Sequence, residues 1–148
     1  MQLTQTLVAT LMAASTAFAA PTGQGEVMAR AANGAQWTIR DLRRVCAQDD
    51  SSCTWTFGID ARDGTATTGC KYVVAAAHAS RANGGPATCG DYTITSGWSG
   101  QFGEGNGFTT FSVINKKKQI AWPAYTDKSV QTGGVVKPDL SFDVKVLG

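Results

Sequence analysis

The fold is decided by the stretch Cys53-Thr54-Trp55-Thr56-Phe57-Gly58-Ile59-Asp60. Its apolar side chains occupy every second position, at Cys53, Trp55, Phe57 and Ile59. In an extended chain successive side chains point to opposite faces, so these apolar side chains would share one face and the threonines the other. The stretch therefore predicts a β-strand with one buried face.

The same alternation recurs in shorter runs on both sides of this strand. They cover residues 37–46, 70–77, 91–98, 108–115, 119–122 and 140–146. The first run is interrupted at Asp41, where we expect a bulge. Short strands separated by Gly, Asn and Asp clusters are typical of a sandwich or a small barrel. The sequence therefore predicts an all-β fold of about seven or eight strands: a single antiparallel β-barrel or sandwich domain, with no helix after the N-terminal segment.

Length and charge limit the number of domains and the classes of partner. The chain has 148 residues, of which 43% are hydrophobic and 16% are charged, so one compact domain is expected. Its formal net charge is only +2. Proteins that bind a phosphate backbone normally carry a strongly basic stripe, which this composition does not provide. Nucleic acid is therefore not expected as a partner.

The first residues have the features of a secretory signal peptide. Residues 7–14 form a short apolar run, and Ala17-Phe18-Ala19 matches the small-x-small pattern that precedes a cleavage site. We therefore expect a cleaved signal peptide over residues 1–19, a flexible leader over 20–36 and a secreted β domain over 37–148. No later run approaches the roughly 20 apolar residues of a bilayer span, so no transmembrane segment is expected. The mature protein is predicted to be extracellular.

Four cysteines in an exported chain favour disulfide bonds over free thiols. Four cysteines allow three pairings. We favour Cys46 with Cys53 and Cys70 with Cys89, because each bond then closes a polar loop between two apolar runs. A zinc site is not expected, since the spacings differ from paired Cys-x-x-Cys motifs and His78 alone cannot complete a ligand set. No cofactor and no other metal ion are predicted.

Candidate catalytic residues are few. His78 is the single histidine, so any Ser-His-Asp or Cys-His arrangement would have to include it. It follows an alanine-rich run, precedes a loop and lacks a Gly-x-Ser-x-Gly motif, so we interpret it as a surface residue. The acidic residues that could supply a glycosidase pair are Asp60, Asp63, Asp91 and Glu104. Nothing in their spacing places two of them beside one bond, and the chain is not expected to be an enzyme.

Three aromatic residues stand in or beside a glycine-rich segment, at Trp98, Phe102 and Phe108. Exposed aromatic rings on a rigid β scaffold can stack on the faces of sugars, whereas buried rings would only fill the end of a barrel. Core filling is the favoured interpretation. Ligand binding by these residues is kept as the alternative.

Two segments taken together resemble a known family. The first is residues 53–59, followed by a cysteine after a polar loop, and the second runs from Phe108–Val113 to Ile120–Asp127. This combination closely resembles a family of small secreted fungal proteins that includes elicitors of the hypersensitive response in plants. The resemblance covers about residues 37–139.

The resemblance implies an extracellular, β-barrel-like protein with two disulfides and no known enzymatic activity, and it transfers no catalytic residues. It further implies an effector or elicitor that can trigger plant defence or hypersensitive cell death, with a role in virulence. The alternative is an extracellular carbohydrate- or small-ligand-binding β module that uses Trp98, Phe102 and Phe108. In either case the partner would be an unknown host or cell-wall component, and a monomer is expected.

Overall fold

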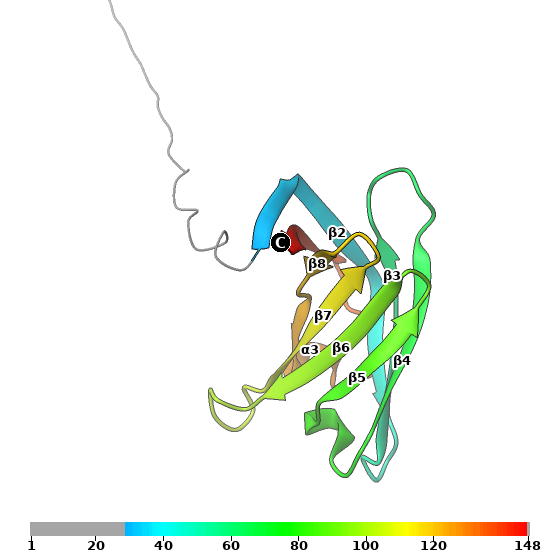
Figure 1. Ribbon diagram of the computed structural model, residues 1–148. Helices are drawn as coiled ribbons and strands as arrows, with labels where there is room; N and C mark the ends of the chain where they lie inside the picture. Colours follow the sequence, from blue (N-terminus) through cyan, green and yellow to red (C-terminus); the bar gives the residue numbers. More distant parts are fainter. Residues whose placement is uncertain (1–28, 148) are drawn as a thin grey trace, which may run out of the picture.

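The computed structural model describes residues 29–147, with side chains from Gly34 onward (Figure 1). Nearly all regular structure is β: β2 (Ala29–Cys46), β3 (Ser52–Asp60), β4 (Thr68–Ala75), β5 (Gly84–Cys89), β6 (Tyr92–Ser99), β7 (Phe108–Asn115), β8 (Gln119–Ala121), β9 (Ala124–Thr126) and β10 (Leu140–Leu147). The part of the chain that the structure describes also contains two single-turn helices, η3 (Ala79–Arg81) and α3 (Asp127–Val130). The expected signal peptide at 1–19 lies outside the described residues.

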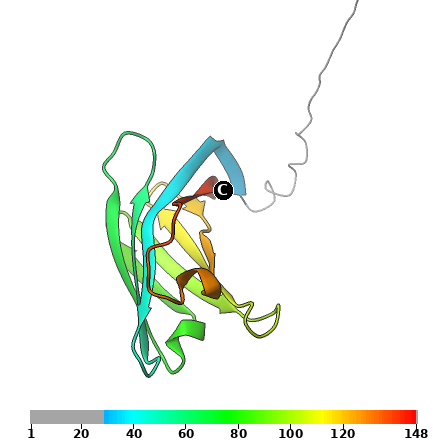
Figure 2. The same cartoon turned by 180° about the vertical axis from the view of Figure 1, so that it is seen from behind.

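The strands form one antiparallel sheet that curls into a nearly closed barrel. The strand order is β4-β3-β2-β10-β8-β7-β6-β5, and β9 pairs with β7 beside this path. Along this path β2 to β4 and β5 to β8 follow the order of the chain, and β10 is inserted between β2 and β8 (Figures 1 and 2). The predicted all-β, antiparallel single-domain fold is confirmed.

The two ends of the sheet, β4 and β5, meet at a seam that is closed by side chains. The Cys70–Cys89 disulfide joins the two strands across it. Beneath the seam, the Tyr72 hydroxyl and the Ser96 hydroxyl are hydrogen bonded at 2.8 Å, which links β4 to β6. A Cβ on Gly84 would lie only 2.8 Å from the Tyr72 oxygen, so glycine allows β5 to approach closely. The seam therefore depends on one covalent bond and one buried polar pair.

The core is built around aromatic side chains from both halves of the barrel. Phe111 on β7 lies with its ring 4.9 Å from Trp55, 6.0 Å from Phe57 and 5.8 Å from Tyr72, measured between centroids. The alternation that predicts β3 is confirmed, since its buried positions are every second residue from Cys53 to Ile59. Phe111 thus fills the barrel between β3, β4 and β7.

Strand β2 contains the expected bulge. The register against β3 shifts between Arg40 and Arg43, and Asp41 adopts a left-handed conformation with φ of 51°. An extra residue in a strand reverses which side chains face inward. Before the bulge Trp37 and Ile39 are buried, and after it the buried positions are Leu42 and Arg44. The bulge therefore places an arginine on the inner face of the barrel.

Strand β2 also begins earlier than the expected start of the domain at Trp37. Ala29 pairs with Leu147 and Ala31 with Lys145, so the N-terminal part of β2 is held by β10. The expected flexible leader at 20–36 is therefore wrong for residues 29–36, which form part of a strand. The rest of that leader lies outside the described residues.

Both predicted disulfides are confirmed, Cys46–Cys53 and Cys70–Cys89. Three short elements, β5, β9 and α3, lie where no strand or helix was expected. The expectation of no helix in the domain is corrected by η3 and α3, each of about one turn. α3 forms because the Thr126 side chain caps it by accepting a hydrogen bond from the Ser129 backbone N–H. Within residues 29–147, no helix is long and apolar enough to cross a membrane.

Removing one buried hydroxyl is expected to stabilise the protein against alkali. The Tyr125 hydroxyl is buried and has no hydrogen-bond partner among the described residues, and burial raises its pKa. The unfolded state therefore loses this proton first, so stability is kept below about pH 10 and falls above it. Tyr125→Phe should raise the free energy of unfolding at pH 7 by up to about 1 kcal/mol. It should also reduce the loss of stability that occurs as the pH rises above about 10.

Urea unfolding of both proteins at pH 7 and at about pH 10.5 measures this effect. Wild type should lose more stability between the two pH values than Tyr125→Phe. Equal losses would show that ionisation of Tyr125 is not coupled to unfolding. Some loss will remain in the variant, because burial also raises the pKa of Tyr72 and of Tyr92.

Candidate functional site: a polar cleft at one end of the barrel

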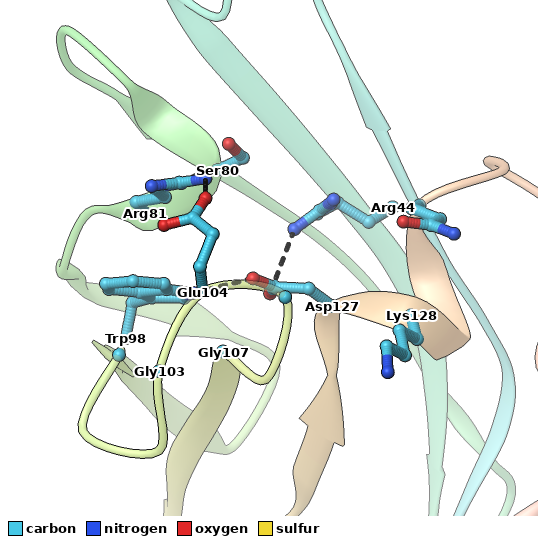
Figure 3. Close-up of a pocket in the computed structure, with 12 residues that line it drawn as sticks. Arg44, Ser80, Arg81, Trp98, Gly103, Glu104, Gly107, Asp127 and Lys128 are labelled. Carbon is cyan, nitrogen blue, oxygen red and sulfur yellow. Dashed lines mark hydrogen bonds and ion pairs between the residues drawn. The ribbon is translucent and has the colours of Figure 1, made fainter.

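A cleft of about 550 Å³ lies where β2 and β6 end, β7 begins and η3 and α3 cap the barrel (Figure 3). Most of its wall is polar or has no side chain. The lining residues that carry the argument are Arg44, Arg81, Trp98, Glu104, Asp127 and Lys128, together with four glycines between residues 100 and 107. Residues distant in the sequence thus meet in one concave surface.

Trp98 and Asp127 form the fixed centre of this cleft. The Trp98 indole Nε1–H donates a hydrogen bond of 2.9 Å to Asp127 Oδ2, which joins the end of β6 to the start of α3. A Cβ on Gly107 would lie 2.5 Å from that same oxygen and 2.5 Å from the indole ring. Glycine at this position therefore permits the contact between the indole and the carboxylate.

Arg81 and Glu104 lie at the mouth of the cleft. The Arg81 guanidinium lies 5.6 Å from the centroid of the Trp98 ring and forms a 3.0 Å ion pair with Glu104. Both charged side chains are more than half exposed. An exposed ion pair of this kind contributes little to stability, and the two side chains can part at low cost.

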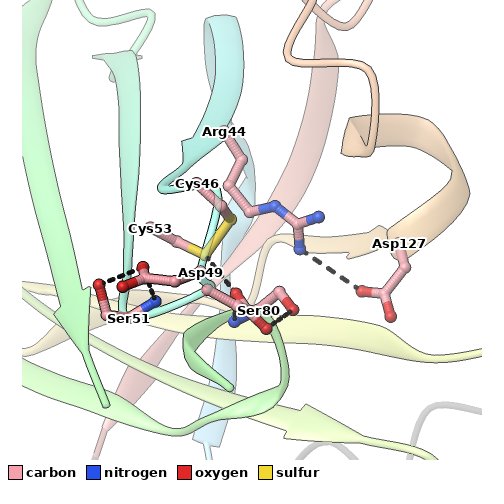
Figure 4. The surroundings of a disulfide bond; sticks show 8 residues. Arg44, Cys46, Asp49, Ser51, Cys53, Ser80 and Asp127 are labelled. Carbon is pink, nitrogen blue, oxygen red and sulfur yellow. Dashed lines mark hydrogen bonds and ion pairs between the residues drawn. A yellow bond between two sulfur atoms is a disulfide. The ribbon is translucent and has the colours of Figure 1, made fainter. Parts of the chain in front are cut away.

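Arg44 lies at the inner end of the cleft with only 8% of its side chain exposed. Its nearest anion is Asp127 Oδ1, 3.7 Å from Nη1 (Figures 3 and 4). Its guanidinium also lies 5.6 Å from the Trp55 ring centroid. Loss of hydration lowers its pKa, an effect only partly offset by Asp127. Arg44 Nε and Nη1 and Asp127 Oδ1 are buried and have no hydrogen-bond partner among the described residues.

The turn between β2 and β3 positions η3 at the edge of the cleft. Asp50, in a left-handed conformation with φ of 57°, accepts hydrogen bonds from the Ser80 backbone N–H at 2.9 Å and from the Ser80 hydroxyl at 2.7 Å. The Cys46–Cys53 disulfide holds the same turn. Asp50 lies near both sulfurs, but disulfide sulfurs are not thiolates and cannot serve as the usual metal ligands.

The structure separates the aromatic residues that the sequence grouped together. Trp98 lines the cleft, whereas Phe102 and Phe108 do not and instead stack on each other with centroids 5.7 Å apart. Phe102 is 65% exposed on the loop after β6. Ligand binding by these residues therefore stays a prediction, in which Trp98 and the phenylalanine pair would act at different places.

His78 is exposed at the end of the turn that leads into η3. Its backbone is left-handed, with φ of 58°, and its side chain makes no hydrogen bond to any described residue. It is not part of the cleft wall.

Both carboxylates of the cleft are already engaged, Glu104 by Arg81 and Asp127 by Trp98. The arrangement is suited to binding through charge and hydrogen bonds.

Sequence reasoning missed Arg44, Arg81 and Asp127 as site residues. A signal for Arg44 was available, because a bulge at Asp41 reverses the phase of β2 and turns Arg44 inward. Asp127 carried no such signal, since it meets Trp98 only after the chain has passed through β7, β8 and β9. Arg81 lies shortly after His78, where the sequence predicts only a loop.

Comparison with known proteins places this architecture in a family. The family model described as "Effector TSP1" matches residues 38–147, which is most of the described chain. A curated relative named "Effector TSP1" from Hypocrea virens (strain Gv29-8 / FGSC 10586) is 61% identical over 144 residues, covering 96% of each chain. The resemblance to a fungal effector family is confirmed, and the chain belongs to the effector TSP1 family.

Proposed function

We propose that this protein is exported and acts as a non-enzymatic effector that plant cells perceive, with a defence response or hypersensitive cell death as the outcome and a role in virulence. Membership of an effector family carries the proposal. Two disulfides in a chain with no free cysteine among the described residues support export to an oxidising compartment. The partner would be a host or cell-wall component.

The non-enzymatic part of the proposal is supported by the state of the candidate catalytic groups. His78 is exposed, lies outside the cleft and has no carboxylate partner among residues 29–147. A nucleophile would need a base within hydrogen-bond reach and a group that orients that base. Recognition would then rely on the folded surface, where a few well-packed side chains supply most of the binding energy.

His78→Ala should therefore leave the plant response within about twofold of wild type, because less than about 0.4 kcal/mol of recognition energy would be lost. The measurement is cell death and oxidative burst in infiltrated leaves over a series of protein doses, with folding checked by circular dichroism. Heat-aggregated protein is the negative control. A folded His78→Ala variant that has lost the response would overturn the non-enzymatic proposal.

A second candidate is binding of a neutral cell-wall polysaccharide, favoured by the exposed Phe102 ring stacked on Phe108. Aromatic faces of this kind can bind sugars in secreted β modules. Pull-down on chitin, cellulose and β-glucan with wild type and Phe102→Ala separates the two functions. Retention that depends on Phe102, without a leaf response, would favour the binding module.

A further inference from the structure

We propose that the polar cleft binds a small saccharide that bears one carboxylate, a hexuronate, with Arg44 as the receptor for the carboxylate. The proposal concerns the cleft alone and does not depend on the effector activity proposed above. It rests on the unsatisfied donors of a buried arginine, on the balance of charge in the wall and on the hydrogen-bonding character of the rim.

Arg44 provides the first argument. A buried guanidinium is costly unless its charge is paired and its donors are hydrogen bonded. Asp127 is its only anion within 4 Å among the described residues, and the 3.7 Å separation is too long for a strong hydrogen bond. Nε and Nη1 therefore remain without acceptors. The end of the guanidinium presents Nη1 and Nη2 side by side, and these two donors match the two oxygens of a carboxylate, which can accept two parallel hydrogen bonds.

The charges of the wall provide the second argument. The cleft has three cationic side chains, Arg44, Arg81 and Lys128, and two carboxylates, Glu104 and Asp127, which leaves an excess of one positive charge. A single carboxylate would balance this excess. A polyphosphate or a nucleic-acid strand would bring several negative charges close to Glu104 and Asp127, which is unfavourable. The wall thus favours a ligand with one negative charge.

The rim provides the third argument. Glu104 and Asp127 can accept hydrogen bonds from ligand hydroxyls, and Lys128 and the Gln131 amide can donate to them. Gly103 and Gly105 have open space where a Cβ would be, so a sugar ring could approach the backbone there. The volume of about 550 Å³ lies in the usual range for small-ligand sites. A hydroxyl-rich ring with one carboxylate uses all of these groups.

The exposed Arg81–Glu104 ion pair and the buried Arg44 line the same cleft. Figure 3 shows Glu104 reaching from the glycine-rich loop to Arg81, beside the Arg44–Asp127 pair. Because this exposed pair is weak, a ligand carboxylate can take the place of Glu104 beside Arg81 on the way to Arg44. The mouth can thus open without a change in the barrel.

The test is a titration of the ¹⁵N-labelled full protein with digalacturonate, followed by nuclear magnetic resonance. The Trp98 Nε1–H resonance reports on the cleft, and Trp98→Phe assigns it. We expect saturable shifts of the Trp98 and Arg44 side-chain signals with digalacturonate and none with the matching neutral disaccharide. No saturable shift, or equal binding of the neutral sugar, would overturn the proposal.

Sodium sulfate separates saccharide recognition from simple attraction of anions. We expect sulfate to bind at least about tenfold more weakly than digalacturonate, because it has no hydroxyls for Glu104 and Asp127. If sulfate produces the same shifts with equal affinity, the cleft attracts anions in general and the proposed ligand class is wrong.

Two charge reversals complete the test. Lys128→Glu changes an exposed side chain of the cleft wall and should weaken digalacturonate binding at least about tenfold. Lys117→Glu makes the same change of net charge at the exposed turn between β7 and β8, outside the cleft wall, and should bind as wild type does. If Lys128→Glu and Lys117→Glu weaken digalacturonate binding equally, the assignment of the binding site to this cleft is wrong. Arg44→Lys, where it folds, should also bind at least about tenfold more weakly.

Discussion

Phe111→Ala is expected to lower the free energy of unfolding by about 3–5 kcal/mol, the usual cost of removing a buried phenylalanine ring. Phe111 is 2% exposed and packs against Trp55, Phe57 and Tyr72, so its removal leaves a cavity in the middle of the barrel. These neighbours belong to strands of a nearly closed barrel. They cannot move inward freely, so we expect a value in the upper half of the range.

Phe102→Ala is the matched control, because it removes the same atoms from a side chain that is 65% exposed. We expect its effect on stability to stay within about 0.5 kcal/mol. Guanidinium unfolding followed by circular dichroism measures both variants. A loss below about 2 kcal/mol for Phe111→Ala would show that the barrel can collapse around the missing ring.

Opening the seam is expected to have the next largest effect. Replacing both Cys70 and Cys89 with Ser should cost about 3 kcal/mol, because the bond closes a loop with a sequence separation of 19. The same change at Cys46 and Cys53, which are 7 residues apart, should cost about 2 kcal/mol. The backbone supports this ranking. Cys46 and Cys53 are already paired in the ladder between β2 and β3, whereas the seam between β4 and β5 has no ladder.

Chemical unfolding of the two double-serine variants under non-reducing conditions tests the ranking. Hydrogen exchange should also show the amides of β5 becoming less protected in the Cys70/Cys89 variant, while β3 stays protected in both. A larger loss of stability in the Cys46/Cys53 variant would contradict the view that the seam is the weaker part of the barrel.

Strands with strong side-chain alternation could be predicted from the sequence, and strands without it could not. β3 and β7 alternate apolar and polar residues, and both were expected within one residue of their observed bounds. β5 is Gly-Gly-Pro-Ala-Thr-Cys and has no such pattern. It is a strand because β6 pairs with it and because the glycines allow a close approach to Tyr72. This information lies in the tertiary fold.

The candidate site illustrates the same limit more strongly. Trp98 could be singled out as an aromatic residue beside glycines, but its role depends on Asp127, which closes the site from the other side of β7. Simple alternation from Trp37 and Ile39 would place Arg44 on the outer face, and its inward position follows only when the phase change at the bulge is applied to the rest of β2. Pairwise contacts between distant segments decide the site, and a single sequence does not display them.

The pairing of Ala29 with Leu147 has a practical consequence for experiments on this protein. It brings the first and last described residues together at one end of the barrel (Figures 1 and 2). Arg44, which lines the cleft, lies near the opposite end of β2 from Ala29. A fluorophore or a surface linker attached after β10 would therefore sit far from Arg44 and Trp98. Protein immobilised in this way would present the cleft uniformly to ligands or to plant extracts.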